Sequence, residues 1–287
     1  SVIIGELAGH ANMTAGADGT VAIGYSAAAA LTTGAGCVAI GYLAAAALTV
    51  GDDNIAIGKN ALSTMATTDG NDNNIAIGSN ALLTAGASSN VATGNIGIGI
   101  NALKLNETGD DNVCVGISAG DAMTDADSCV AIGNGAIGAV ATQDGTVAIG
   151  KSALNTLTSG VSNTTVGYQS GQFCTTGAAN TFIGYDAGKG ITGAKLTADN
   201  NTAVGQNAGL LLQGSADANT FLGRNAGSTV TTGTNNVVVG EGSATDDATA
   251  TNQTVVGTST TGVADNSVTL GNSNVTAVYM AEDKDAI

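Results

Sequence analysis

Few residues of this 287-residue chain could do chemistry. Paired acids can cleave glycosidic bonds when one carboxyl group has a raised pKa. Here the acid pairs lie among Gly, Asn and Thr residues typical of turns, where a carboxylate stays hydrated and ionised. We therefore predict solvated turns rather than a catalytic dyad, with calcium capture as a minor alternative. The pairs are Asp52/Asp53, Asp110/Asp111, Asp125/Asp127 and Asp246/Asp247.

The histidine and the cysteines indicate no further catalytic or metal site. His10 is the only histidine, so a nucleophile–imidazole system is not expected. The four cysteines, Cys37, Cys114, Cys129 and Cys174, show no CxxC spacing, which argues against a zinc site. They occupy positions where neighbouring segments carry small residues, so we interpret them as buried substitutes. The prediction is no enzyme, no catalytic residue, no metal and no cofactor.

Four of the five tyrosines occupy one recurring position, directly after a glycine. The same position also holds Lys59, Lys151, Arg224 and Glu6, and such a mixture predicts that it faces outward. Two pairs of these tyrosines lie 17 residues apart and should stack. An exposed aromatic row could contact glycans, or the rings could simply brace neighbouring segments or a chain interface. The candidate glycan-contact residues are Tyr25, Tyr42, Tyr168 and Tyr185.

These positions recur because the whole chain is a repeat. A short aliphatic run ending in glycine returns from one end to the other, most often after 17 residues. Fixed-period similarity of this kind predicts a solenoid of about sixteen coils, built by stacking one small unit. The anchor glycines are Gly5, Gly24, Gly41, Gly58, Gly78, Gly99, Gly116, Gly133, Gly150, Gly167, Gly184, Gly205, Gly223, Gly240, Gly257 and Gly271.

Within a unit, the residue before the anchor glycine is aliphatic, and the residue three before it is Val, Ile or Thr. A spacing of two puts both on one face of a β-strand, and we expect that face to point inward. The Ala three residues after the glycine suggests a second strand or an inward-turning corner. The structural anchors are Gly24, Gly41, Gly58, Gly150 and Gly184 with Ile23, Ile40, Ile57, Ile149 and Ile183.

Polar residues predict the turns. Asn stands four residues before the anchor glycine in units from Asn54 to Asn236, and stacked in register it should form an amide ladder. The longer spacings place insertions in the turns, within 63–74, 83–95 and 189–201, which loops tolerate at little cost. One edge of the solenoid should therefore carry these bulges.

Composition suits a thin, soluble rod. The chain has 43 Gly, no Pro, no Trp and 3% aromatic residues, so small aliphatic side chains must fill its core. A formal net charge of −16 excludes simple phosphate-backbone binding, and we expect no nucleic-acid partner. No apolar run approaches the roughly 20 residues of a membrane span, so no membrane insertion is expected. We divide the chain into a repeat array, residues 1–263, and a closing neck, residues 264–287.

The units resemble the head domains of YadA-like trimeric autotransporter adhesins, through Val21-Ala22-Ile23-Gly24, Val38-Ala39-Ile40-Gly41, Val130-Ala131-Ile132-Gly133 and Val147-Ala148-Ile149-Gly150. That resemblance implies a homotrimer of left-handed parallel β-rolls. The longer units, such as Gly184-Tyr185-Asp186-Ala187-Gly188 and Gly58-Lys59-Asn60-Ala61-Leu62, are more similar to fibre proteins of tailed bacteriophages. There such repeats often precede a chaperone domain that is cleaved after trimerisation, and residues 268–275 are similar to that junction.

The sequence thus predicts an all-β parallel solenoid that associates as a homotrimeric fibre. By resemblance its function is the shaft or receptor-facing part of a phage tail fibre, located in the virion, with a host polysaccharide or receptor as partner. A bacterial adhesin or extracellular filament at the cell surface is the alternative. A glycan- or ice-binding solenoid is the third; ice binding would need a flat, regular threonine row, and Thr164, Thr181, Thr202 and Thr220 offer only a short, partial one.

Overall fold

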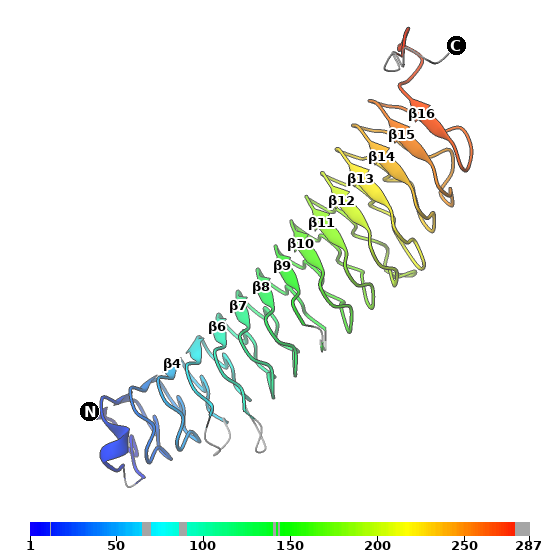
Figure 1. The fold of residues 1–287 in the computed structure, drawn as a ribbon. Helices are drawn as coiled ribbons and strands as arrows, with labels where there is room; N and C mark the ends of the chain where they lie inside the picture. The colour runs from blue at the N-terminus through cyan, green and yellow to red at the C-terminus, as the bar shows by residue number, and fades with distance from the viewer. Residues whose placement is uncertain (12, 65–69, 86–90, 140–141, 143, 279–287) are drawn as a thin grey trace, which may run out of the picture.

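The computed structural model describes residues 1–11, 13–64, 70–85, 91–139, 142 and 144–278. The described chain is a long rod in which sixteen strands form one parallel sheet, each strand paired with the next in sequence (Figure 1). A single 3₁₀ turn, η1 (Ala15–Ala17), is the only helical element in these ranges. The predicted parallel β-solenoid is confirmed.

Every strand has three residues and ends just before an anchor glycine. The strands are β1 (Val2–Ile4), β2 (Val21–Ile23), β3 (Val38–Ile40), β4 (Ile55–Ile57), β5 (Ile75–Ile77), β6 (Ile96–Ile98), β7 (Val113–Val115), β8 (Val130–Ile132), β9 (Val147–Ile149), β10 (Thr164–Val166), β11 (Thr181–Ile183), β12 (Thr202–Val204), β13 (Thr220–Leu222), β14 (Val237–Val239), β15 (Thr254–Val256) and β16 (Val268–Leu270).

Equivalent residues of successive units lie directly opposite one another. Val38 pairs with Ile55 across 17 residues, and Thr181 pairs with Thr202 across 21. The register is therefore independent of the spacing, because the extra residues are accommodated outside the strands. The insertion after Lys189 is one example: Ile191 bridges Ala194 in a tight antiparallel turn. Residues 65–69 and 86–90 of the other two insertions lie outside the described ranges.

The predicted inward ridge is wrong. The middle residue of the strand is the buried one: Ala22, Ala56 and Ala148 have no exposed surface. The residues on either side point outward, and Ile183 is 39% exposed. Alternation along a strand shows which residues share a face but not which face is inside. In coils such as that of β4 the interior is too thin for two aliphatic walls, so the strand contributes the small residue to it. The five anchor isoleucines, Ile23, Ile40, Ile57, Ile149 and Ile183, all lie on the outer face.

The anchor glycines stack on one another. Gly24 has φ +133°, which side chains rarely adopt, and a Cβ there would lie 2.5 Å from the carbonyl oxygen of Gly41. Gly58 repeats this against Gly78, also at 2.5 Å. Backbone therefore meets backbone at this corner from Gly5 to Gly240, and no side chain fits there between successive coils. The same conformation occurs at Gly41, Gly150 and Gly184.

The second apolar stretch is a corner rather than a strand. After the anchor glycine the chain turns, and the Ala three residues on, such as Ala61, is fully buried. The next residue is also buried and takes a left-handed conformation, with φ 50° at Leu62 and 48° at Leu154. Left-handed backbone costs about 1–2 kcal/mol per non-glycine residue. Burial of the Leu side chain, worth about 1.5–3 kcal/mol, offsets that strain.

The predicted amide ladder is confirmed. Asn74 donates from its backbone N–H to Oδ1 of Asn54 at 3.0 Å, and its Nδ2 reaches the carbonyl oxygen of Ala92 at 2.8 Å. Asn219 and Asn236 repeat the pattern, with the Asn236 backbone N–H at 3.1 Å and Nδ2 at 3.0 Å from Asn219 Oδ1. These side chains are buried, so the ladder satisfies polar groups that would otherwise be costly inside the coil.

The sheet continues into the segment that we assigned to a closing neck. β16 pairs in parallel register with β15, and Asp265 Oδ1 accepts the backbone N–H of Thr251 at 2.7 Å. The assigned boundary at residue 264 therefore does not interrupt the sheet. Residues 279–287 of that segment lie outside the described ranges.

Candidate binding surfaces

The largest candidate surface is the outer face of the sheet, defined here as the residues one and three positions before each anchor glycine. It carries two aliphatic or Thr side chains from every strand and no charged residue. Leu222 is 49% exposed on it, and Ile98 is 37% exposed. A contiguous apolar surface of this extent on a water-facing sheet is typical of an interaction site. These are the residues that the repeat pattern predicted to form one ridge, although the predicted ridge was on the inside.

The tyrosine row borders the outer face and stacks as predicted. The ring centroids of Tyr25 and Tyr42 lie 5.4 Å apart with a 12° interplanar angle, and those of Tyr168 and Tyr185 lie 5.1 Å apart at 11°. Lys151 Nζ stands 6.0 Å from the Tyr168 ring centroid. Each ring therefore turns one face to its stacking partner. The glycan-contact assignment stays a prediction, and stacking on a sugar would have to use the outer ring faces.

Three of the paired acids, Asp52, Asp110 and Asp127, accept a backbone N–H of the preceding coil, whereas Asp246 and Asp247 accept hydrogen bonds within their own coil. Asp52 Oδ1 accepts the backbone N–H of Ala35 at 2.7 Å, and Asp127 Oδ1 accepts that of Asp110 at 2.8 Å. Hydrogen bonds from Thr249 hold the pKa of Asp247 below its usual range. That direction is opposite to the raised pKa of a general acid. The arrangement therefore gives these acids a structural task in the described turns.

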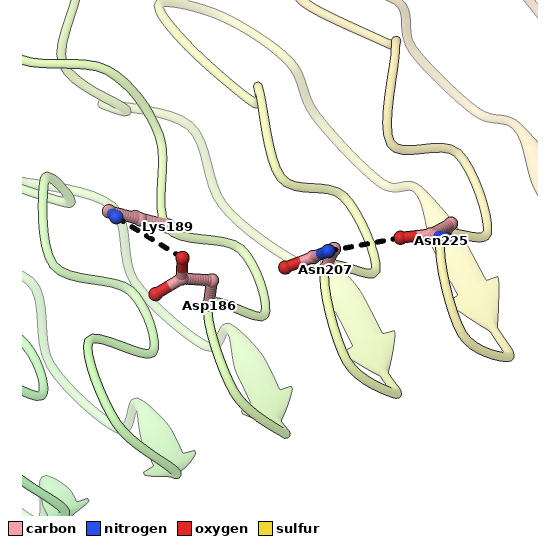
Figure 2. Close-up of polar contacts among 4 residues, drawn as sticks. All are labelled: Asp186, Lys189, Asn207 and Asn225. Atoms are coloured by element: carbon pink, nitrogen blue, oxygen red, sulfur yellow. Dashed lines mark hydrogen bonds and ion pairs between the residues drawn. The ribbon is translucent and has the colours of Figure 1, made fainter.

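A second amide row was missed by the sequence analysis. Asn207 Nδ2 donates to Oδ1 of Asn225 in the next coil at 3.0 Å (Figure 2). One coil earlier the row holds Asp186, whose Oδ2 pairs with Lys189 Nζ at 3.2 Å while Oδ1 is buried without a hydrogen-bond partner. The recurrence of Asn two residues after the anchor glycine could have revealed this row. The same row of part-buried side-chain hydrogen bonds also joins Asn60 to Asn80 and Asn80 to Asn101.

The four cysteines are buried, as the repeat positions predicted. Burial raises the pKa of Cys129 to about 11 and that of Cys174 to about 12. Burial also raises the pKa of Cys37 and Cys114. At neutral pH these groups are thiols, which are poor nucleophiles and poor metal ligands.

No pocket and no group of three potential metal-ligating His, Cys, Asp or Glu side chains is found among the described residues. No helix in the same ranges is long and apolar enough to cross a membrane. Neither protein-family models nor curated proteins give a match to the chain. The candidate sites of this molecule are therefore surfaces, and the outer face is the largest of them.

Proposed function

We propose that this chain is a structural fibre segment, in which three copies pack side by side through their outer faces. One observation carries the proposal: two rows of uncharged, mostly aliphatic side chains run along the outside of the sheet from β1 to β16. A single rod would leave that surface in water. Packing of copies against it removes it from water without requiring any pocket or cofactor.

The size of the outer face fits such packing. Sixteen strands at ~4.8 Å per step give a face about 70 Å long, and with a width of about 10 Å its area is on the order of 700 Å². Standard two-body interfaces bury roughly 800 Å² per partner, so the whole face of one copy, divided between its two neighbours, is comparable to one such surface. The charges lie away from this face, in the turns and the tyrosine row, so association costs little desolvation of charged groups.

As a function, such a fibre holds a binding surface away from a particle. We propose that it serves as the shaft or receptor-facing part of a phage tail fibre that attaches to a host polysaccharide or receptor, in the virion. A bacterial adhesin or filament is the second candidate, supported by the Val-Ala-Ile-Gly units such as 21–24. Both readings require a rigid rod, and stacked backbone hydrogen bonds such as Gly24 N–H to the Ile4 carbonyl at 2.8 Å supply that rigidity.

The first test is the mass of the particle in solution by light scattering. We expect three times the chain mass of 27.5 kDa. A monomer at micromolar concentration would contradict the proposal and make a self-sufficient solenoid with one binding face the better hypothesis.

The second test addresses attachment. The purified rod is presented with a panel of bacterial surface polysaccharides. Double variants Tyr25→Ala/Tyr42→Ala and Tyr168→Ala/Tyr185→Ala then ask whether either tyrosine pair contributes. Loss of binding in one double variant, with the other unchanged, would assign the contact. If both double variants bind as well as the unmodified rod, the tyrosines do not belong to the attachment surface.

A further inference from the structure

The outer face has a repetitive pattern that leaves one property undetermined. Val21 and Ile23 recur as Val38 and Ile40 in the next coil, in the same register. A copy displaced along the rod by one coil would therefore meet nearly the same side chains. Apolar packing alone specifies such a register weakly, just as featureless strands slip in a sheet. If the copies are to align in one axial register, some residues of the outer face must differ from the repeating pattern.

A tract of threonines on the outer face provides such a difference. Strands β10 to β13 carry Thr three residues before the anchor glycine, whereas β1 to β9 carry Val or Ile at that position. The four side chains lie directly opposite one another on adjacent strands and remain at least partly exposed. This tract consists of Thr164, Thr181, Thr202 and Thr220.

The hydroxyl groups of the tract have no partner within the described chain. Thr165, which points inward, donates to the carbonyl oxygen of Val147 at 3.3 Å, but none of the four outward hydroxyls makes a hydrogen bond in the described ranges. Their neighbours on the face are aliphatic, such as Ile183 and Leu222. If this face is covered by another apolar surface, the hydroxyls lose water and gain nothing.

We propose that the threonine tract sets the axial register and the parallel direction of the copies; the inference rests on the proposed association through the outer face. In parallel, in-register copies the hydroxyls of one tract meet those of the next and can pair. A slip of one coil opposes Thr to Val at both ends of the tract, against Val147 and Val237. It does so again on both sides of Thr254, which stands alone between Val237 and Val268.

The tract also distinguishes the two directions. In antiparallel copies aligned end to end, β10 to β13 would face β7 to β4, whose side chains at this position are aliphatic, from Val113 to Ile55. Bringing two antiparallel tracts together instead would leave the outer face of β1 to β6 uncovered. Only the parallel, in-register arrangement covers the whole face and pairs every hydroxyl.

The test is a disulfide that reports register. Ile132, on the outer face of β8 and 36% exposed, is replaced by Cys in one chain, and Ile149, one coil later, is replaced by Cys in a second chain. The two chains are refolded together and oxidised. Disulfide formation needs Cα atoms within about 7 Å, so an axial offset of ~4.8 Å matters. With the native tract we expect same-residue disulfides to exceed mixed disulfides.

Two variants of the tract separate register from stability. Replacing all four threonines of the tract and Thr254 by Val copies the pattern of β2 and β3 and should raise the mixed disulfide several-fold relative to the same-residue product, with the assembled mass unchanged. Replacing the same residues by Ser keeps the hydroxyls and should preserve the native ratio. The chain without a reporter cysteine controls for the four buried thiols.

The outcomes distinguish the two proposals. An assembled Val variant that keeps the native disulfide ratio would overturn this inference alone, as would a native chain that already forms both products equally. Loss of assembly in the Val variant would show that the tract supplies affinity rather than register and would also overturn it. A native chain that is monomeric would overturn the proposed function, and this inference with it.

Discussion

Two parts of the solenoid fill the same narrow core from opposite sides. In coils such as that of β4, the strand contributes Ala56 and the turn contributes Leu62, both fully buried. In the coil of β11, the strand contributes Phe182 and the turn has Gly188 at the equivalent position. A Cβ at Gly188 would lie 2.4 Å from Cδ1 of Phe182, so the ring occupies the space that Leu takes elsewhere. β13 repeats this with Phe221 and Gly227.

The difference shows that a coil can take its core volume from either the turn or the strand. Where the turn supplies the volume, Leu adopts a left-handed conformation, as at Leu62 and Leu82 with φ 50° and 46°. Where the strand supplies it, glycine takes that conformation without strain, at φ 55° in Gly188. The C-terminal solution removes backbone strain but places a large ring on a short strand. Both solutions fit the same register because the anchor corner is unchanged.

The largest effect should come from breaking that shared corner in both parts. Gly58→Ala and Gly205→Ala each place a Cβ 2.5 Å from the carbonyl oxygen of the next anchor glycine. We expect each to lower the free energy of unfolding by at least about 4 kcal/mol, from backbone strain together with overpacking. Urea unfolding followed by circular dichroism measures it. A cost confined to one of the two parts would contradict the shared corner.

The next effect tests volume exchange directly. Phe182→Ala should cost about 3 kcal/mol by leaving a cavity, and Gly188→Leu about the same by overpacking. The double variant reproduces the Ala56/Leu62 pair and should cost much less than the sum of the two. Thermal or urea unfolding of the four proteins gives the coupling free energy. Additive costs would mean that the two parts are not alternative fillings of one space.

The amide ladder should matter equally in both parts. Asn74→Ala and Asn219→Ala each remove a buried amide that accepts from the following coil and donates in turn. We expect each to cost about 2 kcal/mol, because buried polar groups in the neighbouring coils are left unpaired. Asn207→Ala, in the part-buried second row, is the matched control and should cost less. Denaturant midpoints compare the three.

Alkaline pH should weaken both parts through their cysteines. The folded-state pKa of Cys129 is about 11 and that of Cys174 about 12, both above the ordinary value of 9.0. A raised pKa contributes stability that is fully present below pH 9 and is lost as pH rises through 11 to 12. Unfolding free energies measured from pH 8 upward should fall, and Cys129→Ala/Cys174→Ala should flatten the curve. An unchanged slope in that variant would assign the loss to other groups.

The smallest effect concerns the one acid in the second amide row. Asp186→Asn supplies an amide that can donate toward Asn207, extending the row seen in Figure 2. It also removes the ion pair with Lys189. We expect a net stabilisation of about 0.5 kcal/mol, since such part-exposed ion pairs are weak. Asp186→Ala serves as control and should not stabilise. Differential scanning calorimetry has the required precision.

The sequence by itself determined the period, the strand positions and the register. Anchor glycines such as Gly58 mark a corner that only glycine can form, and the Asn residues from Asn54 to Asn236 mark the ladder. The stacking of Tyr168 on Tyr185 followed from the same period. Each of these depends only on equivalent residues lying above one another, and a repeat guarantees that arrangement.

Only the tertiary structure decided which face of the strand is inside. Ile57 and Ala56 are both apolar, and alternation assigns them to opposite faces without choosing between them. The choice depends on the width of the coil, which leaves room for Ala56 opposite Leu62 or for the ring of Phe182 opposite Gly188, but not for a second row of large aliphatic side chains. The larger aliphatic residues are therefore on the outside, and with them the candidate interaction surface. No pattern within one strand contains that width, because it is a property of the closed coil.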